Sequence, residues 1–478
     1  MVGPNFQRPA PPTVQGYTPM PLPAATAAAL GPGGAAQRFV YGAPVDKAWW
    51  TVFGSPELEG LEAEALKANP TLGSAQAALR QARETWLAQR AALFPTVAFQ
   101  GNATRAKNSA TLAPPLNNNS ETYTLYTAQL QLSYVVDVFG GVRRQIESTA
   151  AQAENQRFQT AAAYLTLTAN VASAALQLAA LDDQIAETQA IVEADRQSLV
   201  VTSRQQRFGQ ASGADVAAAR ASLEQAEQLA PPLQKQIDQQ RDLLADLLGR
   251  PPSLAPTNSL RLADFHLPPD LPVRLPAELV RRRPDILAAE ANVHAASAQV
   301  GVAVAARLPS FTIDGALGGA STEITTLVSN GNDLWSIEGG IAQTVLDAGA
   351  LRHKELAARA ALDQAMDQYR VTVLAGLQNV ADVLQAVVDD AHTLEHAGAA
   401  DAAAANSLRI ARQEFVHGQV GSLSVLSAQA ASSQARVTLV QARSARYLDT
   451  VALFQALGGG WDPDEPTTKS NPPPPTTP

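Results

Sequence analysis

The chain has 478 residues, of which 46% are hydrophobic, only 17% are charged and about 90 are alanine, whereas a typical soluble domain has roughly 25% charged residues. The net charge of −9 and the lack of a basic block argue against nucleic acid as the main partner. The absence of cysteine excludes disulfides and thiolate metal sites. Length alone suggests about three domains.

The longest charge-free stretch, residues 160–181, is long enough for a transmembrane helix. It nevertheless contains threonine, asparagine, serine and glutamine, its helical pattern continues into charged residues on both sides, and the mean hydropathy of the chain is −0.07. We therefore interpret it as the buried middle of a very long helix. This leaves open a membrane barrel, whose strands give a much weaker signal.

The sequence indicates a tandem duplication of one unit of about 210 residues. Four landmarks recur in the same order and at nearly the same spacing. They are residues 69–72 and 283–286, 94–95 and 308–309, 137–143 and 347–352, and 209–216 and 418–425.

The first unit, 56–248, follows an extended N-terminal segment, 1–55. It is predicted to contain a helix over 56–93, a β-hairpin over 96–136 with a polar loop at 105–121, and a proline-free helix over 142–206. The first unit ends with a tip turn at 207–213 and a return helix at about 214–248. This helix is predicted to be interrupted at Pro231 and Pro232.

A linker at 249–275 leads to the second unit, 276–457, which repeats the pattern. Its predicted elements are a helix, a hairpin over 310–346 with a loop at about 321–333, a long helix over 351–415, a tip turn at 416–422 and a return helix over 422–457. Residues 458–478 are predicted to be a disordered, proline-rich tail.

A helix of this length, roughly 100 Å at about 1.5 Å per residue, cannot bury its apolar stripe within one hairpin. Four strands cannot close a membrane barrel, since the smallest have about eight. Several chains must therefore share one barrel, with two giving eight strands and three giving twelve. The predicted fold class is mainly α with membrane β: four long-helix segments of an α-helical barrel and four strands of a shared transmembrane β-barrel.

The landmarks, in this order on a duplicated frame, resemble those of the TolC-like outer-membrane efflux channels, in particular the NodT/OprM-type lipoprotein branch. The motifs that carry the resemblance are VGPNFQRP at 2–9, DVFGG at 137–141, LGRPP at 248–252, RPDI at 283–286 and ALGGGW at 456–461.

The resemblance implies a homotrimer with a twelve-stranded barrel in the outer membrane and a twelve-helix periplasmic tunnel. It also implies an equatorial belt formed by the N-terminal segment 1–55, the linker 249–275 and the C-terminal region. Such a channel is a passive duct without cofactor or catalytic residues. A periplasmic adaptor (a membrane fusion protein) connects it to an inner-membrane RND-type pump that expels drugs, solvents or metal ions. The branch also implies an acylated cysteine directly before the VGP run. In this chain it would stand just before Met1, and it is absent.

The same resemblance implies that the glycine turns at Gly209 and Gly418 form the periplasmic gate. Asp215 matches a gate-linking aspartate and Phe415 replaces a gate tyrosine. Val420 replaces a partner arginine, and Ser424 and Ser427 replace two constricting aspartates. This departure favours a constriction of apolar or hydroxyl side chains. The complete set of tip and adaptor-contact candidates is Arg204, Arg207, Gly209, Asp215, Arg409, Arg412, Glu414, Phe415, Gly418, Val420, Leu423, Ser424 and Ser427, with Val425 and Leu426 as further apolar candidates.

The charged tip candidates, and two further charged or histidine-containing motifs, also have interpretations that require no functional site. Charged residues at helix ends interact favourably with the helix dipole. The run Arg281–Arg283 is better explained as the lead into a helix that starts at Pro284, with Asp285 in its first turn, than as an anion patch. His392 and His396 share one helical face, but a solvated face is favoured over a metal site.

Four aromatic residues fall on the predicted strands, where they suit an interfacial girdle or, in a soluble protein, ordinary sheet packing. They are Tyr123, Tyr126, Tyr134 and Trp335. We find no phosphate-binding loop, nucleophile elbow or paired metal motif.

The main alternative to a channel is a periplasmic coiled-coil adaptor, which has no need of duplicated strands. An enzyme ranks third.

Overall fold

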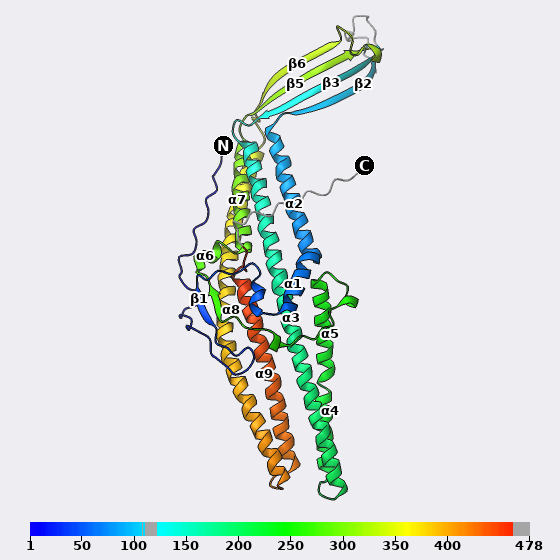
Figure 1. Ribbon diagram of the computed structural model, residues 1–478. Helices are drawn as coiled ribbons and strands as arrows, with labels where there is room; N and C mark the ends of the chain where they lie inside the picture. The colour runs from blue at the N-terminus through cyan, green and yellow to red at the C-terminus, as the bar shows by residue number, and fades with distance from the viewer. Residues whose placement is uncertain (108, 110–121, 462–478) are drawn as a thin grey trace. The chain divides into compact units, whose positions relative to one another are not determined.

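The computed structural model describes residues 1–107, 109 and 122–461. By contacts it divides into two compact units. The strand-containing unit comprises residues 1–9, 78–157 and 288–370, and the helical unit comprises residues 10–77, 158–287 and the described chain from 371 onward. Figure 1 shows the elements of both.

The strand-containing unit holds one antiparallel sheet of four strands in the order β2-β3-β5-β6 (Figure 1). The strands are β2 (Thr96–Lys107), β3 (Thr122–Val136), β5 (Ser310–Ser321) and β6 (Asp333–Ala342). Pairing of β3 with β5 joins the hairpins of the two repeats. Among the described residues β2 and β6 each have one neighbouring strand, so the sheet has two open edges.

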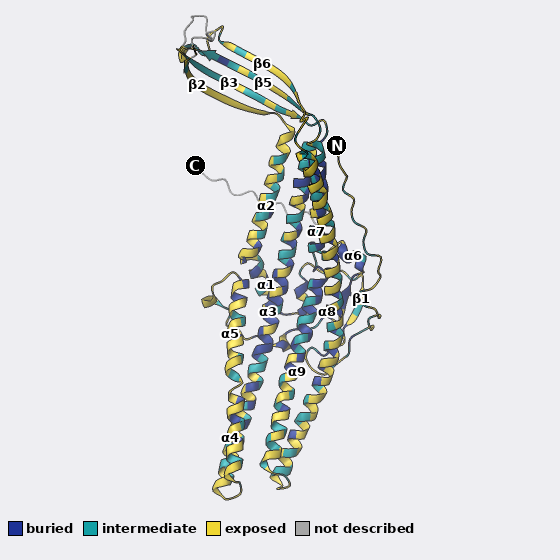
Figure 2. Ribbon diagram, turned by 180° about the vertical axis from the view of Figure 1, so that it is seen from behind, coloured by how far each residue is buried: buried dark blue, intermediate teal, exposed yellow. Residues whose placement is uncertain are grey.

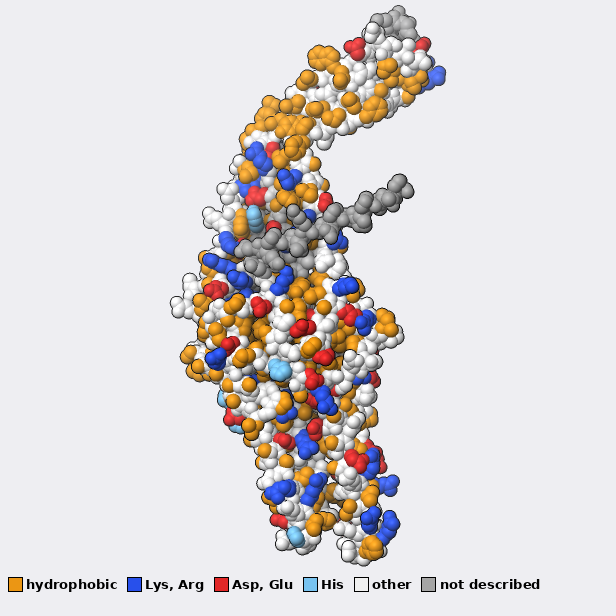
Figure 3. Space-filling model, viewed as in Figure 1, with side chains coloured by type: hydrophobic (Ala, Val, Ile, Leu, Met, Phe, Trp, Pro, Cys, Tyr) orange, Lys and Arg blue, Asp and Glu red, His pale blue; other side chains and the backbone are white. Residues whose placement is uncertain are grey.

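One face of this sheet is apolar and uncovered. The register aligns Phe99, Leu130, Leu317 and Trp335 in one row across the strands, and between 47% and 72% of each side chain is exposed. The adjacent row of Gln100 and Gln129 points to the opposite face. Hydrophobic side chains accordingly spread over the strands in Figure 3. Apolar residues outside and polar residues inside are the pattern of a membrane barrel strand.

Two helices of 67 residues dominate the chain, α3 (Gly141–Arg207) and α8 (Ala350–Val416). Each returns through a second rod, α4 (Gly213–Glu227) with α5 (Ala230–Leu247), or α9 (Ser422–Ala456). The helices before the hairpins are α1 (Pro56–Ala68) and α2 (Pro70–Arg90), and α6 (Pro276–Val280) and α7 (Pro284–Ala305). Short 3-10 helices lie at 49–53, 91–93, 252–254, 262–264 and 324–326.

The helix predicted over 56–93 is in fact interrupted at Asn69. The backbone of Asn69 is extended (φ −65°, ψ 122°), as expected for a residue that precedes proline. The Oδ1 atom of Asn69 accepts hydrogen bonds from the backbone N–H groups of Thr71 and Leu72 at 2.9 and 3.1 Å. Asn69 thus caps α2 and separates it from α1.

The break in the first return helix lies slightly before the predicted position. Helix α4 ends at Glu227 and α5 begins at Ala230, so that Pro231 falls in the first turn of α5, where proline needs no hydrogen-bonded N–H. The second return helix, α9, is continuous.

The predicted disordered tail starts too early. Residues 458–461 are packed: Gly458 and Gly459 have positive φ angles, and the ring of Trp461 lies edge-on to Phe158 with centroids 5.7 Å apart. The remainder of the tail, 462–478, and most of the predicted loop 105–121 lie outside the described residues.

The N-terminal segment and the linker between the repeats form one layer of the helical unit. Strand β1 (Arg38–Tyr41) pairs in parallel with β4 (Asp270–Val273). Beside them a buried aromatic cluster stacks Trp49 on Phe454 at 5.4 Å, and the Tyr447 hydroxyl donates to the Phe265 carbonyl at 2.8 Å. Buried residues concentrate at this level of the helices in Figure 2.

Candidate gate at the ends of the helical hairpins

The two glycine turns have the same backbone geometry. Gly209 and Gly418 follow α3 and α8 with φ angles of 74° and 72°. The next residue in each turn, Gln210 or Gln419, donates its N–H to the carbonyl five residues earlier, at 2.9 or 2.8 Å. This is the Schellman arrangement, in which a left-handed residue ends a helix. Glycine is favoured there because a side chain strains this conformation.

The helices that follow the two turns begin differently. In the first hairpin Ser212 is the N-cap of α4, and its hydroxyl accepts the N–H of Asp215 at 3.2 Å. The Asp215 carboxylate in return accepts the backbone N–H of Ser212 at 2.8 Å, which completes a capping box. In the second hairpin the N-cap of α9 is Gly421, which offers no side chain.

The Asp215 carboxylate also joins the two hairpins. Its Oδ1 atom accepts a hydrogen bond from the Ser422 hydroxyl in the first turn of α9 at 2.6 Å. The hydrogen bonds from Ser422 and then from Ser212 lower the pKa of Asp215 to about 2. The carboxylate therefore stays ionised and able to accept both bonds at any pH near neutrality. One side chain in this way contacts the beginnings of both return helices.

The other sequence candidates surround this link with varying exposure. Arg204, Arg207, Ser424 and Ser427 are exposed, and 72% of the Leu423 side chain is exposed. Glu414, Phe415, Val420, Val425 and Leu426 are half-buried. Arg409 and Arg412 are exposed. Their guanidinium groups donate to Asn406, Gln413 and Gln429, and Arg412 also interacts electrostatically with the Asp195 carboxylate of α3.

The structure adds three residues that the sequence analysis missed. Ser422 was missed because its counterpart one repeat earlier is Gly213, which cannot form such a bond. Phe208, beside Gly209, is 76% exposed; an aromatic residue next to a glycine turn was a usable signal. Arg436 of α9 pairs with Glu187 of α3 at 3.4 Å, across a sequence separation that no local pattern reveals.

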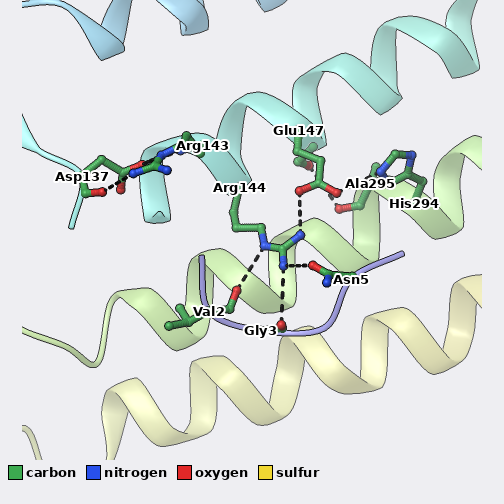
Figure 4. A network of polar contacts seen from close by, with 10 residues as sticks. Val2, Gly3, Asn5, Asp137, Arg143, Arg144, Glu147, His294 and Ala295 are labelled. Carbon is green, nitrogen blue, oxygen red and sulfur yellow. Dashed lines mark hydrogen bonds and ion pairs between the residues drawn. The ribbon is translucent and has the colours of Figure 1, made fainter. Parts of the chain in front are cut away.

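A second polar cluster holds the N-terminal residues within the strand-containing unit (Figure 4). The buried guanidinium of Arg144 donates to the Val2 carbonyl at 3.1 Å, to Asn5 Oδ1 at 2.6 Å and to Glu147 at 2.7 Å. Glu147 also contacts His294 Nε2 at 3.0 Å. These contacts hold the N-terminal residues against the beginning of α3.

The structure also shows the surroundings of the arginine run 281–283 and of His392. Helix α7 begins at Pro284 as predicted, and the guanidinium of Arg283 donates to the Ala456 carbonyl at 2.8 Å and pairs with Asp285 at 2.8 Å. His392 lies 3.5 Å from Glu395 on an exposed face of α8. Within the described residues no three histidine or acidic side chains assemble as a metal site.

The model of the outer membrane efflux protein family matches residues 61–250 and 275–459, so the chain belongs to that family. It is 30% identical over 427 residues to the pyoverdine export outer membrane protein OpmQ of Pseudomonas putida. The aligned region covers 88% of this chain and 90% of that protein. It is 29% identical over 467 residues to the outer membrane protein OprJ of Pseudomonas aeruginosa, covering 96% and 93%.

Comparison with solved structures supports the same family assignment. The outer-membrane channel OprN superposes with a TM-score of 0.85 at 27% identity, covering 96% of this chain and 99% of that one. The outer membrane protein VceC of Vibrio cholerae superposes with a TM-score of 0.82 at 25% identity, covering 87% and 100%. The predicted fold class is confirmed. The protein is an outer-membrane efflux channel, neither an enzyme nor a periplasmic adaptor.

Proposed function

We propose that three copies of this chain form the exit duct of a tripartite efflux system. Each copy supplies four strands with open edges and an exposed apolar face, which can persist in a bilayer only if copies close them into a barrel. A periplasmic adaptor connects the duct to an inner-membrane RND-type pump, which supplies the energy. The cargo is a drug, another toxic compound or a metal ion.

We further propose that the ends of the hairpins close the duct on the periplasmic side. The observation that carries this proposal is the bond between Ser422 and Asp215, because it ties one hairpin of a protomer to the other at the point where both return helices begin. Opening requires the hairpins to separate and therefore to break this bond. The exposed side chains of Phe208 and Leu423 supply apolar bulk at this level.

Two single substitutions separate the link from the helix cap. Ser422→Ala removes the bond between hairpins and leaves the capping box intact, whereas Ser212→Ala removes one half of the box and leaves the link. In planar bilayers we expect Ser422→Ala and Asp215→Ala to raise the resting conductance severalfold and Ser212→Ala to change it little. Equal conductance of all three variants and the unmodified protein would contradict the gate. Light scattering in detergent tests the trimer, which a monomer without pore activity would rule out.

We also propose that the protein carries a lipid anchor on a cysteine just before Met1. The Arg144 cluster supports this, since it fixes Val2 and Asn5 at the beginning of α3, directly after the strands. Mass spectrometry of protein isolated from its native membrane should detect a diacyl or triacyl adduct. An unmodified N-terminal peptide would exclude the anchor.

A further inference from the structure

An apolar cavity lies where the strands meet the helices of the strand-containing unit. It has a volume of about 480 Å³ and is lined by the ends of β3, β5 and β6, the beginning of α3 and the end of α7. Most of the lining side chains are apolar, among them Val136, Val302, Leu308 and Phe311. On one side the rings of Phe139 and Phe311 pack with centroids 6.3 Å apart. All these elements belong to the same compact unit.

The cavity continues the uncovered apolar face of the sheet. Val136 of β3 pairs with Phe311 of β5, as Leu130 pairs with Leu317. On each strand the two residues are an even number of positions apart, so all four side chains point to the same face. This is the face that a membrane barrel turns toward lipid. The cavity therefore adjoins the lipid-facing surface at the periplasmic ends of the strands.

After β6 the chain changes from exposed apolar residues to exposed basic residues. Val345 and Leu346 are 93% and 89% exposed, which suits contact with lipid. Arg352 and Lys354, at the beginning of α8, are exposed and form no ion pair or side-chain hydrogen bond with any described residue. The helix dipole disfavours positive charge at this end of a helix, so helix stability does not account for these two residues.

The carboxylates nearest to them in the sequence are already engaged. Glu355 is shared by two guanidinium groups, since it pairs with Arg359 at 2.8 Å and also with Arg307, two residues after the end of α7. Asp347 accepts two backbone N–H groups at the beginning of α8, at 2.9 and 2.7 Å. This region therefore carries more positive charge than its own carboxylates compensate, although the whole chain has a net charge of −9.

Arg307 brings part of this charge to the edge of the cavity. Its neighbours Ala306 and Leu308 line the cavity, and its carbonyl accepts a hydrogen bond at 3.1 Å from Gln343, which also lines it. The Arg307 side chain is 48% exposed. Figure 3 shows Lys and Arg side chains on the helices next to the hydrophobic side chains at the ends of the strands. Apolar volume and excess positive charge thus adjoin where the chain leaves the strands.

We propose that this site binds an anionic phospholipid of the periplasmic leaflet, with an acyl chain in the cavity and the headgroup phosphate at Arg307, Arg352 and Lys354. Basic residues next to a membrane surface attract anionic lipids, and guanidinium groups form strong, charge-assisted hydrogen bonds with phosphate. The inference goes beyond the duct but rests on the proposed function, because it requires the sheet to lie in a bilayer as part of a trimer.

Native mass spectrometry of the purified trimer tests the site. Dioleoyl-phosphatidylglycerol should be retained at least about fivefold more than dioleoyl-phosphatidylcholine, because only the first is anionic. Arg352→Gln combined with Lys354→Gln should abolish this preference. Ala306→Trp, which fills the cavity from an exposed position, should lower the retention of both lipids. Dihexanoyl-phosphatidylglycerol, with the same headgroup but short chains, should be retained less than the dioleoyl lipid.

A matched control removes two basic residues far from the strands in sequence. Arg220→Gln combined with Lys235→Gln changes exposed residues of the first return helix and should leave the preference unchanged. Equal retention of the two dioleoyl lipids, an undiminished preference in the Arg352 and Lys354 variant, or the same loss in the control would overturn the site. Undiminished retention in Ala306→Trp would exclude the acyl chain from the cavity. A conducting trimer without lipid preference contradicts only this site, whereas a monomer without pore activity contradicts the duct.

Discussion

The long helices α3 and α8 have the same length but different surroundings. Both contain 67 residues, and their most apolar windows have mean hydropathies of 1.3 and 1.5, enough to cross a membrane by composition alone. Yet 72% of the α3 window is buried inside the protein, against 28% of the α8 window. Leu176 of α3 is fully buried, while 66% of Leu374 in α8 is exposed.

This difference shows that a repeated sequence pattern need not have the same role in both copies. The apolar window of α3 forms the core of the protomer, with Val171 and Leu178 fully buried. The window of α8 is buried on one face only, where Val380 and Leu384 are fully buried, and Leu374 on its other face is exposed; in a trimer a neighbouring copy would cover this exposed face. Three matched pairs of substitutions test this and related differences within the protomer.

The largest expected effect comes from truncating matched leucines. Leu176→Ala should destabilise the protomer by about 2–5 kcal/mol, because it opens a cavity in the core. Leu374→Ala should change protomer stability by less than about 0.5 kcal/mol but weaken the trimer. Guanidinium unfolding followed by circular dichroism measures the first effect and light scattering in detergent the second. If Leu374→Ala left the trimer intact and unfolded as easily as Leu176→Ala, the assignment of α8 to the interface would be wrong.

The starts of the two long helices allow a second comparison. Arg144 in α3 holds Val2 and Asn5, whereas His353 stands at the matching position of α8. Arg144→Met should release residues 2–6, because the bonds to a charged donor are each worth roughly 1.5–3 kcal/mol. Hydrogen exchange of this segment should accelerate by at least tenfold, while His353→Met should leave it unchanged. Comparable exchange in both variants would show that the Arg144 cluster does not hold the segment.

The third prediction concerns a buried carboxyl group of the first repeat. Glu62 of α1 is fully buried with both oxygens unbonded, and burial raises its pKa from 4.5 to about 9. Since the folded state holds this proton more tightly than the unfolded state, stability falls as pH rises from about 5 to 9, by at most roughly 1.4 kcal/mol per pH unit.

Glu62→Gln should flatten this decline, as measured by unfolding midpoints at several pH values, and the exposed Glu59→Gln should not. An unchanged pH profile in Glu62→Gln would mean that the carboxyl group is solvated or paired in solution.

Much of the architecture could be predicted because it follows from local periodicity. Alternation at Val97 and Phe99 predicted a strand, and proline-free helical runs predicted α3 and α8 almost to the residue. The breaks at Asn69 and near Leu229 were missed or misplaced by a few residues, because the capping side chain and the helix end depend on local geometry that periodicity does not encode.

The contacts at the ends of the helical hairpins were predicted only in part. Gly209, Gly418 and Asp215 stood out as repeated or family-like positions. The partner of Asp215 did not, because the hydroxyl of Ser422 lies 207 residues further along the chain.

By itself, the sequence determined the duplicated helix and strand elements and the need for further copies, because periodicity, proline positions and strand count act locally or by simple arithmetic. Only the tertiary structure decided which apolar helix is buried and which carboxylate joins the hairpins. These properties depend on which side chains meet across hundreds of residues, and two nearly equivalent repeats can fold alike while facing different neighbours.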